Sequence, residues 1–145
     1  MADIVLISPR FEVSFWGLEH ALPVLGRRAT MPPASLALLA ALTPPGHAVT
    51  LVDENVEAVD YDRCAAADIV GLTGMSVQRG RMRAILGELR RRGAFTVVGG
   101  PWVTVEEDAF GPLADGCRPR PGRGCAGGWP GRARSRRRGT VGRGD

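Results

Sequence analysis

The chain has 145 residues, of which 19 are basic and 15 acidic, and its net charge is +4 at neutral pH. No apolar run is long enough to cross a bilayer and no secretory signal pattern opens the chain, so we expect a cytoplasmic protein without a membrane span. Only one of the three cysteines, Cys64, lies before residue 116. The sequence therefore excludes a disulfide framework and a four-cysteine metal site.

The charge is unevenly distributed along the chain. Residues 1–115 hold ten Arg and fourteen acidic residues, whereas residues 116–145 hold nine Arg, nine Gly and one acidic residue. The second segment buries too little apolar surface to offset the entropy of ordering. We predict a domain over 1–115 and a disordered tail over 116–145, with the composition of GC-rich DNA read in a shifted frame. The alternative is a nucleic-acid-binding segment, although such segments usually offer more aromatic residues than Trp129 alone.

The first half of the domain predicts two strands separated by a long connection and an apolar helix. Ile4 to Ser8 is a buried strand, and residues 9–30 form an unusually long connection. Prolines in the first turn open a helix at Thr30, which is apolar nearly all round and ends at Pro44-Pro45-Gly46. The second strand, Ala48 to Asp53, leads into an acidic loop.

The second half of the domain continues the alternation. A short helix near 60–66 and a third strand over 68–73 precede a longer helix, which Ser76 is placed to cap and Gly93 to end. Helical spacing predicts which of its side chains are buried and which arginines point outward. The buried set is Met82, Ile85, Leu86 and Leu89, and the outward set is Arg79, Arg81, Arg83 and Arg90 to Arg92.

A fourth strand over 95–99 and a last helix complete the predicted elements. A capping box at Thr104 to Glu107 starts that helix, which runs to about Phe110. The alternation of strands and helices predicts an α/β fold with a flavodoxin-like (Rossmann-like) doubly wound parallel sheet. A fifth strand would follow, but the tail has neither alternation nor a β-branched run. We therefore expect the sheet to lack its fifth strand.

Two strand-to-helix junctions carry the strongest functional signal. Buried β-branched runs stop at Thr73-Gly74-Met75-Ser76 and at Gly99-Gly100-Pro101-Trp102. Open α/β sheets bind ligands at the carboxyl ends of their strands, and small residues let the backbone approach a ligand closely. We expect a flat ligand across these junctions. The alternative is that these residues only turn and cap the chain, with Trp102 as a core aromatic.

Two other ligand classes of such sheets are excluded. A dinucleotide site needs a glycine-rich turn after the first strand, where this chain has Ser8-Pro9-Arg10. A phosphoacceptor receiver needs an acidic residue at the end of the third strand and a Lys after the fifth. Here the third strand ends in Leu72-Thr73, and the chain has no Lys.

The two junctions resemble those of the cobalamin-binding domain found at the amino end of cobalamin-dependent radical S-adenosylmethionine enzymes. The resemblance covers residues 3–115 and implies that a corrin ring lies over both junctions, with Asp53 and Glu54 near its edge; without that ring, this acidic pair reads as a solvated loop. Longer runs are similar to a subgroup that includes hopanoid methyltransferases: Ser8 to Trp16, Leu42 to Pro45, Val52 to Asn55, Thr73 to Arg79 and Val98 to Thr104.

The resemblance also indicates what this chain lacks. His20 and His47 do not have the neighbours of the histidine that ligates cobalt in other cobalamin domains, so we expect no metal ligand from the protein. The family's three-cysteine iron–sulfur cluster and its S-adenosylmethionine site lie in a downstream barrel domain, to which this domain would normally be fused. The parent reaction implied is methyl transfer, and we expect no activity from this chain alone. The alternatives are a nucleic-acid-binding protein that uses the Arg-rich tail and a noncatalytic interaction module.

Overall fold

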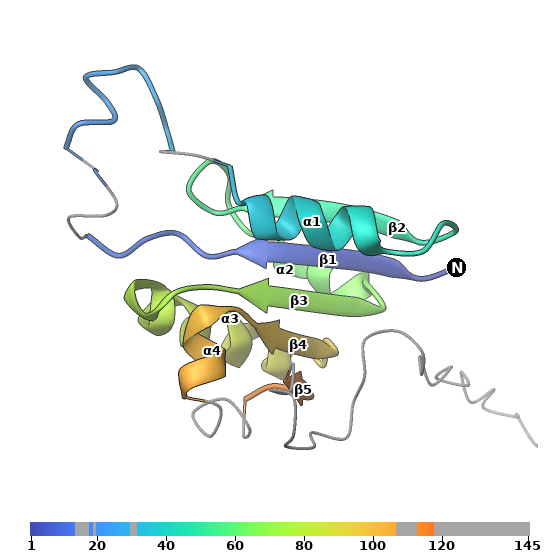
Figure 1. Ribbon diagram of the computed structural model, residues 1–145. Helices are drawn as coiled ribbons and strands as arrows, with labels where there is room; N and C mark the ends of the chain where they lie inside the picture. Colours follow the sequence, from blue (N-terminus) through green and yellow to red (C-terminus); the bar gives the residue numbers. More distant parts are fainter. Residues whose placement is uncertain (14–17, 19, 30–31, 107–112, 118–145) are drawn as a thin grey trace, which may run out of the picture.

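A computed structural model describes residues 1–13, 18, 20–29, 32–106 and 113–117. Its five strands form a single parallel sheet in the order β2-β1-β3-β4-β5 (Figure 1). This order confirms the predicted flavodoxin-like doubly wound sheet. The elements are β1 (Asp3–Ser8), α1 (Ala34–Leu42), β2 (Ala48–Asp53), α2 (Tyr61–Ala66), β3 (Ile69–Thr73), η1 (Ser76–Gln78), α3 (Arg79–Arg91), β4 (Thr96–Gly99), α4 (Pro101–Val105) and β5 (Gly116–Cys117).

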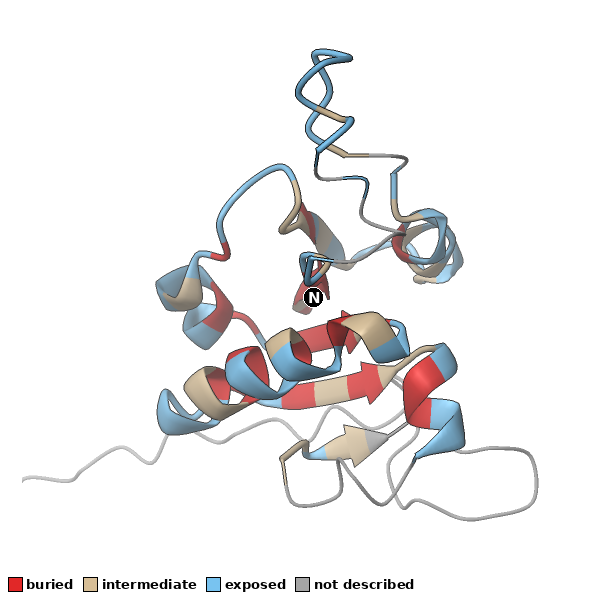
Figure 2. Ribbon diagram, turned by 90° about the vertical axis from the view of Figure 1, so that its left-hand side faces the viewer, coloured by how far each residue is buried: buried red, intermediate tan, exposed pale blue. Residues whose placement is uncertain are grey.

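The sheet divides the core into two layers, as the side chains of β1 show. Alternate side chains of a strand point to opposite faces of the sheet. Val5 and Ile7 accordingly belong to a large cluster with α2 and α3, whereas Ile4 and Leu6 belong to a smaller cluster with Leu36 of α1. Buried residues are concentrated on the strands and on the helix faces turned toward them (Figure 2). Both faces of the sheet are therefore covered, as a parallel sheet requires.

Helix α3 has the amphipathic character that its sequence predicts. Met82, Ile85, Leu86 and Leu89 are all 0% exposed. Burying a side chain of this size contributes roughly 1.5–3 kcal/mol, so this stripe is a major contributor to the core. The helix ends at Arg91, and Gly93 terminates it as expected, because its φ of +71° is readily adopted only by glycine.

Helix α1 differs from its prediction. Pro32 and Pro33 precede the helix instead of forming its first turn, and Pro33 is the N-cap residue. The helix is apolar, but it buries only one leucine, Leu36, while Leu38 is 60% exposed and Leu42 is 68% exposed. The apolar composition is as predicted, but α1 packs on the sheet through one side only. No helix in the described part of the chain is long and apolar enough to cross a membrane.

The predicted absence of a fifth strand is wrong. Gly116 and Cys117, which the sequence placed in the tail, form β5 and pair in parallel with Val97 and Val98 of β4. Asp115 fixes the start of this strand, because its carboxylate accepts hydrogen bonds from the backbone N–H and the hydroxyl of Thr96. Parallel pairing uses backbone groups, so it needs no β-branched side chains. Residues 118–145 of the predicted tail lie outside the described residues.

Two predicted helix starts are also corrected. Ser76 does not cap α3 but begins η1, and the side chain of Gln78 accepts the hydrogen bond from Met75 N at 2.9 Å. Thr104 lies inside α4, which begins three residues earlier, at Pro101. The Thr104 hydroxyl therefore donates back to Gly100 O at 3.0 Å instead of capping a new helix. The predicted end of that helix, near Phe110, lies outside the described residues.

Candidate functional site

The two predicted junctions lie side by side at the carboxyl edge of the sheet. Thr73 is paired in register with Gly99 at the ends of β3 and β4. Beyond the strands, Trp102 N donates a hydrogen bond to Gly74 O at 3.4 Å. The structure therefore brings together the eight predicted site residues of these two segments: Thr73, Gly74, Met75, Ser76, Gly99, Gly100, Pro101 and Trp102.

Two glycines of the junctions, Gly74 and Gly100, are required by the fold itself. Gly100 has a φ of +104°, and a Cβ added there would lie 2.6 Å from Thr73 Oγ1 and 2.9 Å from Gly74 N. A Cβ on Gly74 would lie 2.6 Å from the sulfur of Met82. These distances are far below van der Waals contact. Both glycines therefore allow the two junctions and α3 to pack closely, which is the structural role that the sequence left open for them.

Only some of the junction residues are exposed to solvent. Met75 is 42% exposed, and Ser76 and Pro101 are also exposed. Trp102 is only 4% exposed, and the guanidinium carbon of Arg83 lies 5.5 Å from its ring centroid. The indole is therefore a core aromatic with a cation over it. The junction residues of intermediate exposure are Thr73, Gly99 and Gly100.

Gln78 was not predicted as part of this edge, but it connects two of its loops. The order in which successive strands are added to the sheet reverses between β1 and β3, and ligands of doubly wound sheets bind at such a switch point. Gln78 is 3% exposed there; its amide nitrogen donates to Pro9 O, after β1, and its oxygen accepts from Met75 N, after β3. A Gln three residues after a helix N-cap was the available sequence signal.

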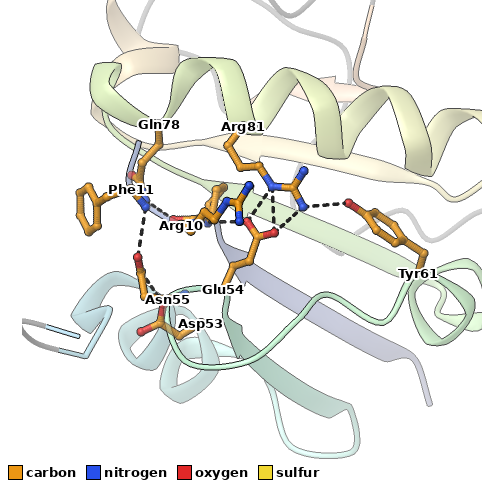
Figure 3. A network of polar contacts seen from close by, with 9 residues as sticks. Arg10, Phe11, Asp53, Glu54, Asn55, Tyr61, Gln78 and Arg81 are labelled. Carbon is orange, nitrogen blue, oxygen red and sulfur yellow. Dashed lines mark hydrogen bonds and ion pairs between the residues drawn. The ribbon is translucent and has the colours of Figure 1, made fainter. Parts of the chain in front are cut away.

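Asp53 and Glu54 lie apart from the two junctions, because β1 separates β2 from β3. Glu54 is not in a solvated loop: its side chain is 6% exposed, and its carboxylate forms an ion pair with Arg81 (Figure 3). The Asp53 carboxylate accepts hydrogen bonds from the backbone and the side chain of Asn55 at 3.0 and 2.7 Å. Both carboxylates are therefore engaged within the protein.

Arg81 is not directed into solvent, contrary to its prediction. Its side chain is 26% exposed, and its guanidinium also contacts the hydroxyl of Tyr61 at 3.3 Å. The hydrogen bond to Glu54 raises the pKa of Arg81 above its ordinary value, so the cation stays charged at every accessible pH. A cavity of about 420 Å³ beside this pair is lined by Arg10, Tyr61 and the loop after β2.

The described residues contain no cluster of three or more His, Cys, Asp or Glu side chains that is placed to hold a metal ion. His20 is exposed, and His47 accepts a hydrogen bond from Ala2 N, at the opposite, amino edge of the sheet. Burial raises the pKa of the Cys64 thiol, with a further contribution from Asp60. This thiol is therefore a neutral core group.

The chain is similar in sequence to part of several longer proteins. The chain is 36% identical over 104 residues to an uncharacterized methyltransferase of Synechocystis sp., an alignment that covers 72% of this chain and 19% of that protein. It is 34% identical over 108 residues to hopanoid C-2 methylase of Rhodopseudomonas palustris, covering 74% of this chain and 20% of the methylase. These homologues are methyltransferases.

A third relative is a methyltransferase that is named for a different substrate. The chain is 34% identical over 82 residues to bacteriochlorophyllide d C-8(2)-methyltransferase of Chlorobaculum tepidum, covering 56% of this chain and 18% of that enzyme. The chain thus spans about a fifth of the length of the curated relatives it matches. No protein-family model and no solved structure matches it.

Proposed function

We propose that this chain binds cobalamin at the carboxyl edge of its sheet, as the N-terminal part of a cobalamin-dependent radical S-adenosylmethionine methyltransferase. The methyltransferase relatives support the reaction class. The observation that carries the cofactor assignment is the contact between the β3 and β4 junctions, where Trp102 N bonds Gly74 O. This contact joins the two segments that resemble the cobalamin-binding family into one continuous surface.

The residues at this edge fit a flat macrocycle. The indole of Trp102 is buried in the core, and the exposed or half-buried residues of the two junctions carry no charge: Thr73, Met75, Ser76, Gly99, Gly100 and Pro101. Met75 is 42% exposed, and Ser76 is exposed beside it. We infer that this uncharged surface of the two junctions supports one face of the corrin ring through van der Waals contact and backbone hydrogen bonds.

The chain would bind and orient the cofactor without taking part in the chemistry. Bound cobalamin supplies a cobalt that carries a methyl group. Thr73 to Ser76 and Gly99 to Pro101 would hold the macrocycle from one side, leaving its other face open to the remainder of the enzyme. The iron–sulfur cluster and S-adenosylmethionine belong, on this proposal, to that remainder.

A large side chain at position 76 is expected to block cofactor binding. Ser76→Trp places an indole on the exposed rim of the β3 junction, and we expect affinity for hydroxocobalamin to fall by about tenfold or more, equivalent to roughly 1.4 kcal/mol. The measurement is the cobalamin spectrum retained with the full chain after gel filtration, across a titration. Ser35→Trp is the matched control, because Ser35 is also exposed but lies on α1. Equal retention by the two variants would contradict the site, and no retention by the unaltered chain would contradict the function.

Replacement of either histidine is expected to leave the spectrum of bound cobalamin unchanged. His20 is exposed on the long connection, and the imidazole of His47 is bonded to Ala2 N at 3.3 Å, at the amino edge of the sheet. Neither position is at the end of β3 or β4. His20→Ala and His47→Ala should therefore bind hydroxocobalamin with the same absorption maxima. A shift of these maxima in one variant would identify that histidine as an axial ligand.

A further inference from the structure

The first three residues after β1 are held by side chains from other loops. Gln78 donates to Pro9 O, Glu54 accepts from Arg10 N at 3.0 Å, and Asn55 accepts from Phe11 N at 3.1 Å. These three residues belong to no helix or strand, so their backbone groups have no regular partners. Side chains from the β2 and β3 loops supply those partners and fix the strap formed by residues 9–11 (Figure 3).

Glu54 is the central residue of this arrangement. Its backbone N–H donates to Ser8 O at 2.9 Å, which continues the pairing of β2 with β1. Its carboxylate then bonds Arg10 N and both Nε and Nη2 of Arg81. A carboxylate that is only 6% exposed is stable as an anion only when it is paired and hydrogen-bonded. Arg81 of α3 therefore holds Glu54 in the orientation in which it bonds the strap.

We propose that Glu54 and Arg81 form a latch that positions the strap beside the cobalamin site. This inference rests on the proposed function. The strap leaves β1 at the switch point, and Gln78 ties it directly to the β3 junction. Within the part of the chain that the structure describes, the strap is therefore placed to border, from the β1 side, a ligand lying over β3 and β4. Both members of the pair act as positioning residues, because their charges are engaged with each other and with backbone.

The latch is tested by amide hydrogen exchange and by cobalamin affinity in the same variants of the full chain. Glu54→Gln keeps the shape of the side chain but loses the ion pair. We expect the Arg10 amide to exchange about tenfold faster and the Kd for hydroxocobalamin to rise about fivefold. The Phe11 amide, held by Asn55, should lose less protection. Arg91→Met is the control, because Arg91 is 75% exposed at the far end of α3 and should alter neither quantity.

The two readouts separate failure of the latch from failure of the proposed function. Unchanged Arg10 exchange in Glu54→Gln would overturn the latch. Faster exchange with unchanged affinity would overturn its positioning role. If the unaltered chain does not bind hydroxocobalamin, the proposed function and this positioning role both fail, whereas the exchange data still decide whether the latch exists. Should Glu54→Gln fail to fold, the double variant Glu54→Gln with Arg81→Met, which leaves no unpaired charge, is used for both measurements.

Discussion

Adding a single methyl group at position 100 is expected to remove much of the stability of the domain. Gly100 has φ +104° and ψ 175°, a region of backbone conformation that is essentially restricted to glycine. The added Cβ of Gly100→Ala would also lie 2.6 Å from Thr73 Oγ1 and 3.0 Å from Gly74 O. Backbone strain and overpacking cost about 1–3 kcal/mol each, so we expect a loss of about 3 kcal/mol or more. The total free energy of unfolding of a small domain is roughly 5–15 kcal/mol.

Two other glycines provide matched controls for this effect in urea unfolding. Gly93 has φ +71°, and apart from its chain neighbours no atom of the described residues lies within 4 Å of an added Cβ, so Gly93→Ala should cost only its backbone strain, about 1–2 kcal/mol. Gly87 lies within α3 and is also unobstructed, so Gly87→Ala should stabilise by about 1 kcal/mol. A loss in Gly100→Ala no larger than that in Gly93→Ala would contradict the close approach of the two junctions. Because Gly100 serves the fold, its replacement is not a clean probe of cofactor binding.

Truncation of two leucines of the same helix is expected to have very different effects. Leu36 is 1% exposed and belongs to the core layer beneath α1, whereas Leu38 is 60% exposed. Leu36→Ala should destabilise the domain by about 2–5 kcal/mol, through lost burial and the cavity left behind. Leu38→Ala should change stability by less than about 0.5 kcal/mol, because it removes few contacts.

Denaturant midpoints of the two variants, compared with the unaltered chain, give this measurement directly. The two changes share residue type, helix and chemistry, so helix propensity affects both similarly. The difference between the two losses of stability therefore measures the contribution of burial. Equal losses in both variants would mean that the outer side of α1 is covered in solution, in conflict with the exposure of Leu38 and Leu42.

These leucines also show which parts of the fold the sequence predicts. In α3, the apolar spacing of Met82 to Leu89 alternates with arginines, so the buried face is readable from the sequence and the structure confirms it. Helix α1 has no such contrast, because it contains no charged residue. Which side of α1 is exposed depends on the elements that pack beside it, and the periodicity of its own sequence cannot predict this.

The candidate site divides in the same way. Small residues after β3 and β4 identified both junctions in the sequence. The two junctions were expected to meet because the carboxyl ends of adjacent parallel strands lie at one edge of the sheet. The pairing of Glu54 with Arg81, 27 residues apart, depends on how α3 packs against α2 and the sheet, and it has no local signature in the sequence. The strand β5 was missed for a related reason: Gly116 and Cys117 pair through backbone groups, so their side chains carry no strand signal.

The most direct test of the account is a map of backbone amide chemical shifts in the full chain as hydroxocobalamin is added. We predict that the largest changes fall at Thr73 to Ser76 and Gly99 to Trp102, excluding Pro101, which has no amide proton, with smaller changes in residues 10–11 of the strap. Amides on α1 and at the amino ends of the strands should not move. No shift at saturating hydroxocobalamin, or shifts confined to α1 or the amino edge, would contradict cobalamin binding at this edge of the sheet.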